Sequence, residues 1–104
     1  MIRVTFRGCA DTLQGFRIEG HAGMGVTGED IVCAAVSSAA YMTANTITEI
    51  IGATADITVD DGLMDLTVTQ RVNACQDILA GLRTHIEAMQ DQYPHGVQLI
   101  NTEV

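Results

Sequence analysis

The feature that most constrains this chain is a segment without glycine or proline between Gly28 and Gly52. The segment, Glu29–Ile51, is rich in Ala, Ile, Val and Met, and this composition predicts one long helix. Gly52 is suited to the left-handed conformation that commonly ends a helix. Thr27 and Asp30 have the spacing of a capping box, although the helix could begin at a neighbouring residue instead. A helix this apolar needs a sheet or a second helix to pack against.

Period-two alternation of apolar and polar residues predicts strands on both sides of this helix. The pattern runs from Ile2 to Arg7, breaks at a turn over Gly8–Asp11 and resumes over Gly15–Glu19, which predicts an N-terminal hairpin. A second hairpin is predicted where two further alternating segments flank an Asp-Gly turn, at Ala55–Asp60 and Leu63–Gln70 around Asp61-Gly62.

A second, amphipathic helix is predicted after these strands. Asn73 or Gln76 is a suitable start and Pro94-His95-Gly96 ends it; its apolar stripe consists of Val72, Cys75, Ile78, Leu79, Leu82, Ile86 and Met89. A short strand over Val97–Asn101 completes the order ββαββαβ. The economical fold for this order is α+β, a mostly antiparallel sheet with two helices packed on one face. No internal boundary interrupts the 104 residues, so residues 1–104 are predicted to form a single domain.

The charge balance limits the partners of the chain. Thirteen Asp and Glu residues face five arginines, for a formal net charge of −8. Such a surface repels phosphate backbones and attracts a basic protein, so nucleic-acid binding is not expected. The termini carry no uncharged apolar window long enough for a signal peptide or membrane span, which predicts a cytoplasmic protein without a membrane partner. An odd number of cysteines, three, predicts free thiols rather than a disulfide framework.

Cys33 and His21 are the candidate catalytic pair. Cys33 falls near the start of the long helix, where unpaired backbone N–H groups and the helix dipole stabilise a negatively charged sulfur. His21 precedes a glycine-rich loop, and Cys33 follows it. A loop that leaves a strand and enters a helix can bring its two ends together, and a thiol beside an imidazole supplies a nucleophile and a general base. The alternative is a solvated loop histidine and a buried helix cysteine.

Two polar residues share a helical stripe with the Cys33 thiol. Asp30 and Ser37 stand three residues before it and four after it. Asp30 either orients His21 or caps the helix, and Ser37 either reaches the thiol or bonds to a carbonyl of its own helix. The other cysteines and histidines are predicted to be structural or solvated: Cys75 in the core, and Cys9, His85 and His95 at turns or boundaries. No spacing among them is typical of a metal site.

The paired motif resembles that of the ribosomal-processing cysteine proteases, the Prp family. The residues that carry the resemblance are Gly20-His21-Ala22-Gly23, then Gly28, then Asp30-Ile31-Val32-Cys33-Ala34-Ala35-Val36-Ser37. The length and the order of elements also fit. One departure is Met24-Gly25-Val26-Thr27, where family members often carry an aromatic and further polar residues, and this departure bears on substrate preference.

The resemblance implies an endopeptidase without a cofactor. Family members remove an N-terminal extension from a large-subunit ribosomal protein, number twenty-seven, after an apolar, aromatic-containing stretch and just before a basic mature start. By match of motif, Cys33 is the nucleophile and His21 the general base, with Asp30 and Ser37 in support. The resemblance also implies a homodimer, and a loop between the pair that moves to admit substrate, with Gly23, Gly25 and Gly28 as hinges.

Two other functions are compatible with the residues. A non-catalytic ribosome-assembly adaptor would bind the same basic ribosomal segment through the acidic surface and would not need the thiol. Thiol redox sensing is disfavoured because Cys33 has no resolving cysteine nearby in sequence, although Cys9 could approach it in space. Ala39, Ala40, Tyr41 and Met42 are compatible with either a dimer contact or the core, and we predict the core.

Overall fold

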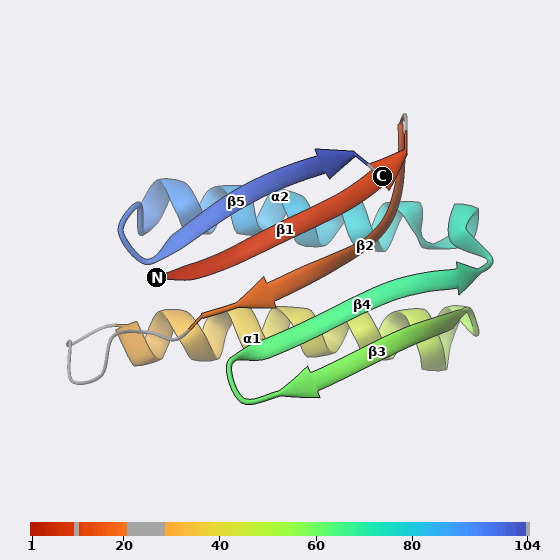
Figure 1. Cartoon of the computed structure of the whole chain (residues 1–104), viewed down its shortest axis with the longest axis horizontal. Coiled ribbons are helices and arrows are strands. Elements are labelled where there is room, and N and C mark those ends of the chain that lie inside the picture. The colour runs from red at the N-terminus through yellow and green to blue at the C-terminus, as the bar shows by residue number, and fades with distance from the viewer. Residues whose placement is uncertain (10, 21–28, 104) are drawn as a thin grey trace.

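The fold is a five-stranded sheet covered on one face by two helices, as the computed structural model shows for residues 1–9, 11–20 and 29–103 (Figure 1). The elements follow the predicted order ββαββαβ. They are β1 (Ile2–Cys9), β2 (Thr12–Glu19), α1 (Glu29–Asn45) with a π-helical segment (Thr46–Ile51), β3 (Thr54–Asp60), β4 (Leu63–Gln70), a 3-10 turn (Val72–Cys75), α2 (Gln76–Gln92) and β5 (Val97–Glu103).

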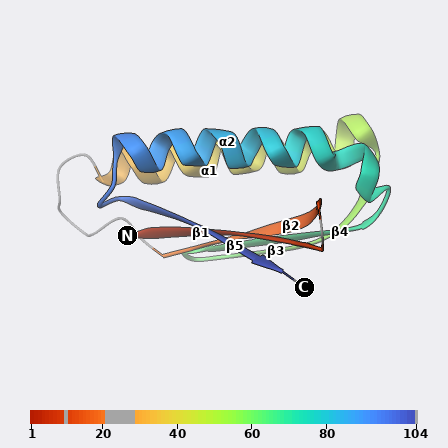
Figure 2. The ribbon, with the colours of Figure 1, turned by 90° about the horizontal axis from the view of Figure 1, so that it is seen from above.

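The sheet has the strand order β3-β4-β2-β1-β5. β1 pairs with β2, β2 with β4, and β3 with β4 in antiparallel fashion, while β1 and β5 are parallel. Figure 2 shows α1 and α2 on the same side of the sheet, and Figure 1 shows them next to each other behind it. The predicted α+β class, the mostly antiparallel sheet and the placement of both helices on one face are therefore confirmed.

The core lies between the sheet and the helices. Alternate residues of the strands point toward the helices. Leu79, Leu82, Ile86 and Met89 of the predicted stripe are buried on α2, while Val72 and Cys75 of that stripe lie in the 3-10 turn before it. The most deeply buried members are Val4, Phe6, Phe16, Val36, Ile47, Leu66, Cys75, Leu79, Ile86 and Val97. Burial of each large apolar side chain stabilises the fold by about 1.5–3 kcal/mol. The predicted burial of Cys75 is confirmed.

The helix predicted over Glu29–Ile51 changes its winding near its end. Its last six residues, Thr46–Ile51, form a π-helical segment. Thr43, Thr46 and Thr48 each donate a side-chain hydrogen bond to the carbonyl four residues earlier, an interaction that competes with regular winding. Gly52 ends the segment as predicted, with a φ of 75°, and the N–H of Ala53 donates to the carbonyl of Ile47 at 2.9 Å.

Other predicted boundaries were wrong by a few residues. The turn predicted at Gly8–Asp11 is shorter, because β1 continues through Cys9 and β2 begins at Thr12. β5 reaches Glu103 rather than Asn101. Both extensions come from pairing: β1 bonds to β2 on one side and to β5 on the other, with Gly8 opposite Glu103. Ladder bonds of this kind are invisible to an alternation pattern.

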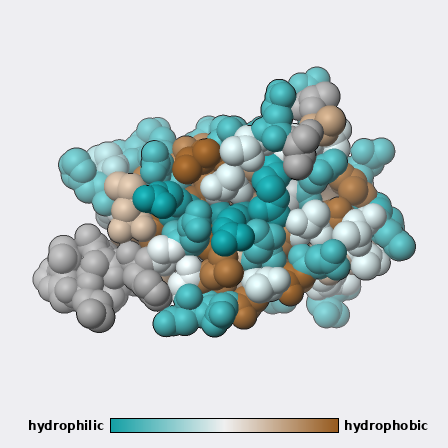
Figure 3. Space-filling model, in the orientation of Figure 1, coloured by the Kyte–Doolittle hydropathy of each residue, from teal (hydrophilic) through white to brown (hydrophobic). Residues whose placement is uncertain are grey.

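The open face of the sheet is mostly polar (Figure 3). Arg7 forms a two-pronged ion pair with Asp65, at 3.0 and 2.8 Å, and Arg17 adds a third contact to the same carboxylate at 3.3 Å. Because Asp65 lies on β4 and the arginines lie on β1 and β2, these contacts tie three strands together.

Residues Ile31–Ile51 are long and apolar enough to cross a membrane by length and composition alone, yet only 33% of that window is buried. A core helix passes the same test, and Val32, Val36 and Ala40 are indeed buried in the core. Packing therefore accounts for the apolar character of one side of α1. The opposite side is exposed and carries no charged residue between Asp30 and Glu49. Tyr41 and Met42 lie on the surface there, so the prediction that they belong to the core was wrong.

Candidate active site

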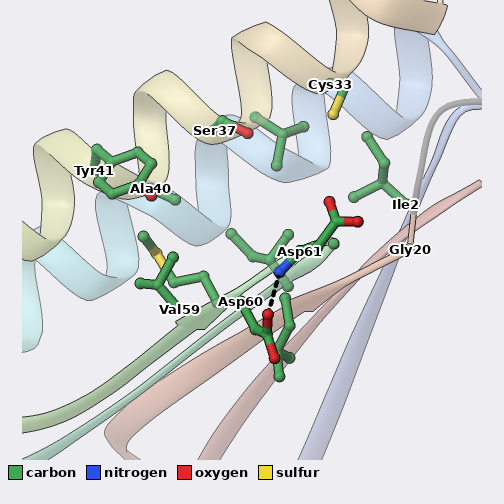
Figure 4. Close-up of a pocket in the computed structure, with 14 residues that line it drawn as sticks. Ile2, Gly20, Cys33, Ser37, Ala40, Tyr41, Val59, Asp60 and Asp61 are labelled. Atoms are coloured by element: carbon green, nitrogen blue, oxygen red, sulfur yellow. Dashed lines mark hydrogen bonds between the residues drawn. The ribbon is translucent and has the colours of Figure 1, made fainter.

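A pocket of about 200 Å³ opens between the first half of α1 and the turn that joins β3 to β4 (Figure 4). Its described lining comes from four strands and one helix: Ile2, Ile18, Gly20, Cys33, Val36, Ser37, Ala40, Tyr41, Val59, Asp60, Asp61, Gly62, Leu63 and Met64. The floor is apolar where the sheet and helix meet, and the polar atoms lie at the rim.

Cys33 stands at the rim of this pocket. Its side chain is half-buried and the thiol is free. Ser37 follows one turn later on the same side of α1 and lines the same pocket, as Figure 4 shows. The helical spacing read from the sequence therefore does bring these two side chains to one cavity. Asp30 belongs to the first turn of α1, and its side chain lies outside the described part of the structure.

Gly20 shapes the pocket through its backbone. Its φ of 106° is one that side chains rarely permit, and a Cβ there would collide with the carbonyl oxygen of Met1. Its N–H donates to the carbonyl of Gly62 at 3.1 Å, which links the end of β2 to the β3–β4 turn. Glycine at position 20 thus lets the chain leave β2 directly beside the pocket.

Four of the residues predicted for the site and its loop lie outside the described residues: His21, Gly23, Gly25 and Gly28. The pairing of His21 with Cys33 consequently stays a prediction.

Sequence analysis missed the wall opposite Cys33, which Val59, Asp60, Asp61 and Leu63 of the β3–β4 hairpin form. It also missed Tyr41, which lines the pocket from the same helix as Cys33. The N–H of Asp61 donates to Oδ1 of Asp60 at 2.8 Å, which fixes one of these carboxylates in the turn. The Asp-Gly signal did predict the turn itself. Nothing local indicates that it faces Cys33, because this juxtaposition depends on the strand order of the whole sheet.

The other two thiols have different surroundings. Cys75 is fully buried, and burial raises the pKa of its thiol, an effect that the positive charge of Arg71 partly opposes. Cys9 is exposed at the end of β1 opposite to Ile2, which lines the pocket. His85 and His95 are exposed on α2 and in the turn after it. Among the described residues, no group of three or more His, Cys, Asp or Glu side chains is arranged to hold a metal ion.

A free, half-exposed thiol at a pocket near the start of a helix is typical of enzymes that use cysteine as a nucleophile. The family model of cysteine protease Prp matches residues 1–98. The chain therefore belongs to this family, and it is a cysteine protease. Among curated proteins, none matches the chain.

Solved structures share the fold over nearly the whole chain. SMU.848 from Streptococcus mutans is 27% identical, with a TM-score of 0.88 over 100% of this chain and 96% of that one. The essential ribosomal processing protease Prp from Staphylococcus aureus is 24% identical and was solved with a substrate peptide and with a covalently linked product peptide. These two structures give TM-scores of 0.89 and 0.87, and each covers 98% of this chain and 100% of its own.

Proposed function

We propose that this protease removes the N-terminal extension of a large-subunit ribosomal protein, number twenty-seven, with Cys33 as nucleophile and His21 as general base. The observation that carries the proposal is the Cys33 thiol at the rim of the pocket. Of the three free thiols, Cys75 is buried in the core and Cys9 lies at the far end of β1, so Cys33 alone among them combines access with a pocket.

The proposed reaction is acyl transfer through the thiol. The Cys33 sulfur attacks the scissile carbonyl, and its proton passes to His21. Backbone N–H groups at the start of α1 are candidates for binding the developing oxyanion. His21 then protonates the leaving amine, and water hydrolyses the acyl-enzyme to release the extension and restore the thiol. Asp30 and Ser37 are assigned supporting roles.

The proposed substrate agrees with the charge of the protein. A net charge of −8 favours a basic ribosomal protein precursor over nucleic acid. Asp61 places an acidic group at the rim of the pocket itself, as Figure 4 shows. The similar protease from Staphylococcus aureus is a ribosomal processing protease that binds a substrate peptide, which supports a substrate of the same kind here. We place the reaction in the cytoplasm, where thiols remain reduced.

A cleavage assay read by mass spectrometry tests this proposal. The wild-type protein is mixed with a peptide spanning the extension and the basic mature start, and a single cut is expected at their junction. Cys33→Ala and His21→Ala should each lower the rate by at least about 10³-fold, because each removes a partner of the acyl-transfer step. Cys9→Ala, which changes an exposed thiol far from the pocket, is the matched control. Near-wild-type cleavage by Cys33→Ala would disprove the mechanism.

The alternative function is a non-catalytic adaptor that binds the basic segment. Alkylation by iodoacetamide across a pH series distinguishes the two. A protease requires that Cys33 react rapidly near neutral pH through its thiolate. An adaptor would show three thiols of ordinary or suppressed reactivity.

We further propose that the protein is a homodimer joined through the outer face of α1. No charged residue occurs between Asp30 and Glu49. The exposed side of this stretch carries Ile31 and Met42 beside the small residues Ala34, Ala35 and Ser38. Two copies of an acidic chain can meet on an uncharged face without opposing like charges, and small residues allow two helices to approach closely.

A further inference from the structure

β3 is the free edge of the sheet nearest the pocket. Within residues 1–9, 11–20 and 29–103 it pairs with β4 on one side only, so the backbone N–H and C=O groups along its other side are available to a further strand. The opposite edge, β5, lines no part of the pocket, whereas Val59 and Asp60 at the end of β3 do.

The helix-facing side of β3 is an exposed apolar surface. Ile57 lies opposite the buried Leu66, and Val59 lies opposite the buried Met64, so both side chains point toward the helices. They nevertheless stay 41% and 51% exposed, because β3 overhangs the edge of the helical layer. Tyr41 of α1, 48% exposed, lines the pocket together with Val59.

This surface, formed by Tyr41, Ile57 and Val59, is continuous with the pocket that holds Cys33. Figure 4 shows Tyr41 and Val59 on facing elements. Cys33 lies nearer the start of α1, on the side of the pocket toward which β3 runs. An extended peptide laid along β3 in the direction of that strand would therefore deliver its carboxyl end to the thiol.

The charges on β3 argue against a second copy of the chain as the occupant. Asp56 and Asp60 alternate with Ile57 and Val59 along β3, so their side chains project to the other face of the sheet. Antiparallel pairing of two β3 strands centred on Thr58 would set Asp56 of one copy opposite Asp60 of the other, and like charges facing each other across a ladder are destabilising. A peptide from a basic protein meets no such repulsion.

We propose that β3 binds the apolar segment before the scissile bond as a sixth strand, parallel to β3, with alternate side chains against Tyr41, Ile57 and Val59. This inference rests on the proposed function and specifies how the substrate is recognised. Backbone hydrogen bonds to β3 would supply affinity, and the apolar surface would select apolar or aromatic side chains at alternate positions. The segment then ends at Cys33, which fixes where the cut falls.

An N-methyl scan of the peptide tests the backbone pairing. Binding to Cys33→Ala, which holds the peptide without cutting it, is measured by fluorescence anisotropy for peptides methylated at one amide each across the apolar segment. Methylation removes a donor, so affinity should fall about three- to tenfold at every second amide and change little at those between. A scan without period two overturns the proposal.

Two substitutions in the protein test the apolar surface. Val59→Thr and Ile57→Thr keep a β-branched residue in the strand and should each weaken binding of the same peptide about three- to tenfold. Ile100→Thr, the matched change on the other edge strand, should leave affinity unchanged. Equal affinity in all three variants, or loss of dimer rather than of peptide binding in the β3 variants, overturns the proposal. Because binding is read without cleavage, a protein that binds in this way but cuts nothing would contradict the proposed function alone.

Discussion

The two helices have the same length and cover the same face of the sheet, yet their outer surfaces differ. α2 buries Leu79, Leu82, Ile86 and Met89 and turns charged residues to solvent, as a scaffold helix does. α1 also buries one side, but its outer side has no charge between Asp30 and Glu49, and Ile31 and Met42 are 69% and 55% exposed there. The outer side of α2 is thus that of a helix facing water, whereas the outer side of α1 is the uncharged face through which we propose that two copies join.

The largest expected difference between the two helices is in the reactivity of the cysteine thiols associated with them. Cys33 of α1 is half-exposed, whereas Cys75, directly before α2, is fully buried. Iodoacetamide can reach Cys75 only when the structure opens, so Cys75 should react on the order of 10³-fold or more slowly than Cys33 in the native protein. Peptide mapping of a labelling time course measures both rates. Similar labelling rates for Cys33 and Cys75 would mean that α2 is not a rigid part of the fold. The control is labelling in denaturant, where the two rates should converge.

A charged residue placed on the outer face of α1 should weaken the proposed dimer, whereas one placed on the outer face of α2 should not. Met42→Glu puts a carboxylate into the proposed dimer contact on α1, and dimer affinity should fall about a hundredfold or more, because two like charges would be buried together. Ala88→Glu makes a matched change on the exposed side of α2 and should leave the dimer intact. Sedimentation velocity over a concentration series reports both. A dimer that survives Met42→Glu would exclude this face.

The smallest expected effect concerns the pH dependence of stability. Burial raises the pKa of the Cys75 thiol, so the folded state favours the neutral form. The stabilisation is fully present below the ordinary thiol pKa of about 8.5 and is lost as the pH rises toward the raised value in the folded state. The free energy of unfolding should therefore fall more steeply above about pH 8.5 in the wild type than in Cys75→Ala. Denaturant titrations at several pH values measure the slopes, and Cys9→Ala should retain the wild-type slope.

Local patterns were sufficient to predict most of the fold. Alternation in Ile2–Arg7 and the stripe on α2 are each determined by which side of one element is buried, and Gly52 and Asp61-Gly62 act through their own backbone. The ends of β1 and β5 were not predictable in this way, because they depend on pairing between segments far apart in sequence. The π-helical segment was also missed, since Thr43, Thr46 and Thr48 are compatible with an ordinary helix.

The candidate site was predictable only on the side where its residues are close in sequence. Cys33 and Ser37 are one helical turn apart, so their common pocket follows from helix geometry. Val59 and Asp61 reach the same pocket through a strand order that no local signal specifies. Tyr41 was assigned to the core because an apolar residue in an apolar helix is usually buried. That reasoning fails where a helix has two apolar sides.

The parallel pairing of β1 with β5 has a consequence for the timing of folding. Ile2, which forms part of the pocket wall, donates its N–H to Gly96 at 2.9 Å and pairs with Val97. During synthesis, β1 cannot pair with β5 until the segment from residue 97 onward has left the ribosome. Contacts across such sequence separations form late and slowly. The side of the pocket formed by Ile2 is thus held in place only once the segment that forms β5 is available to pair with β1.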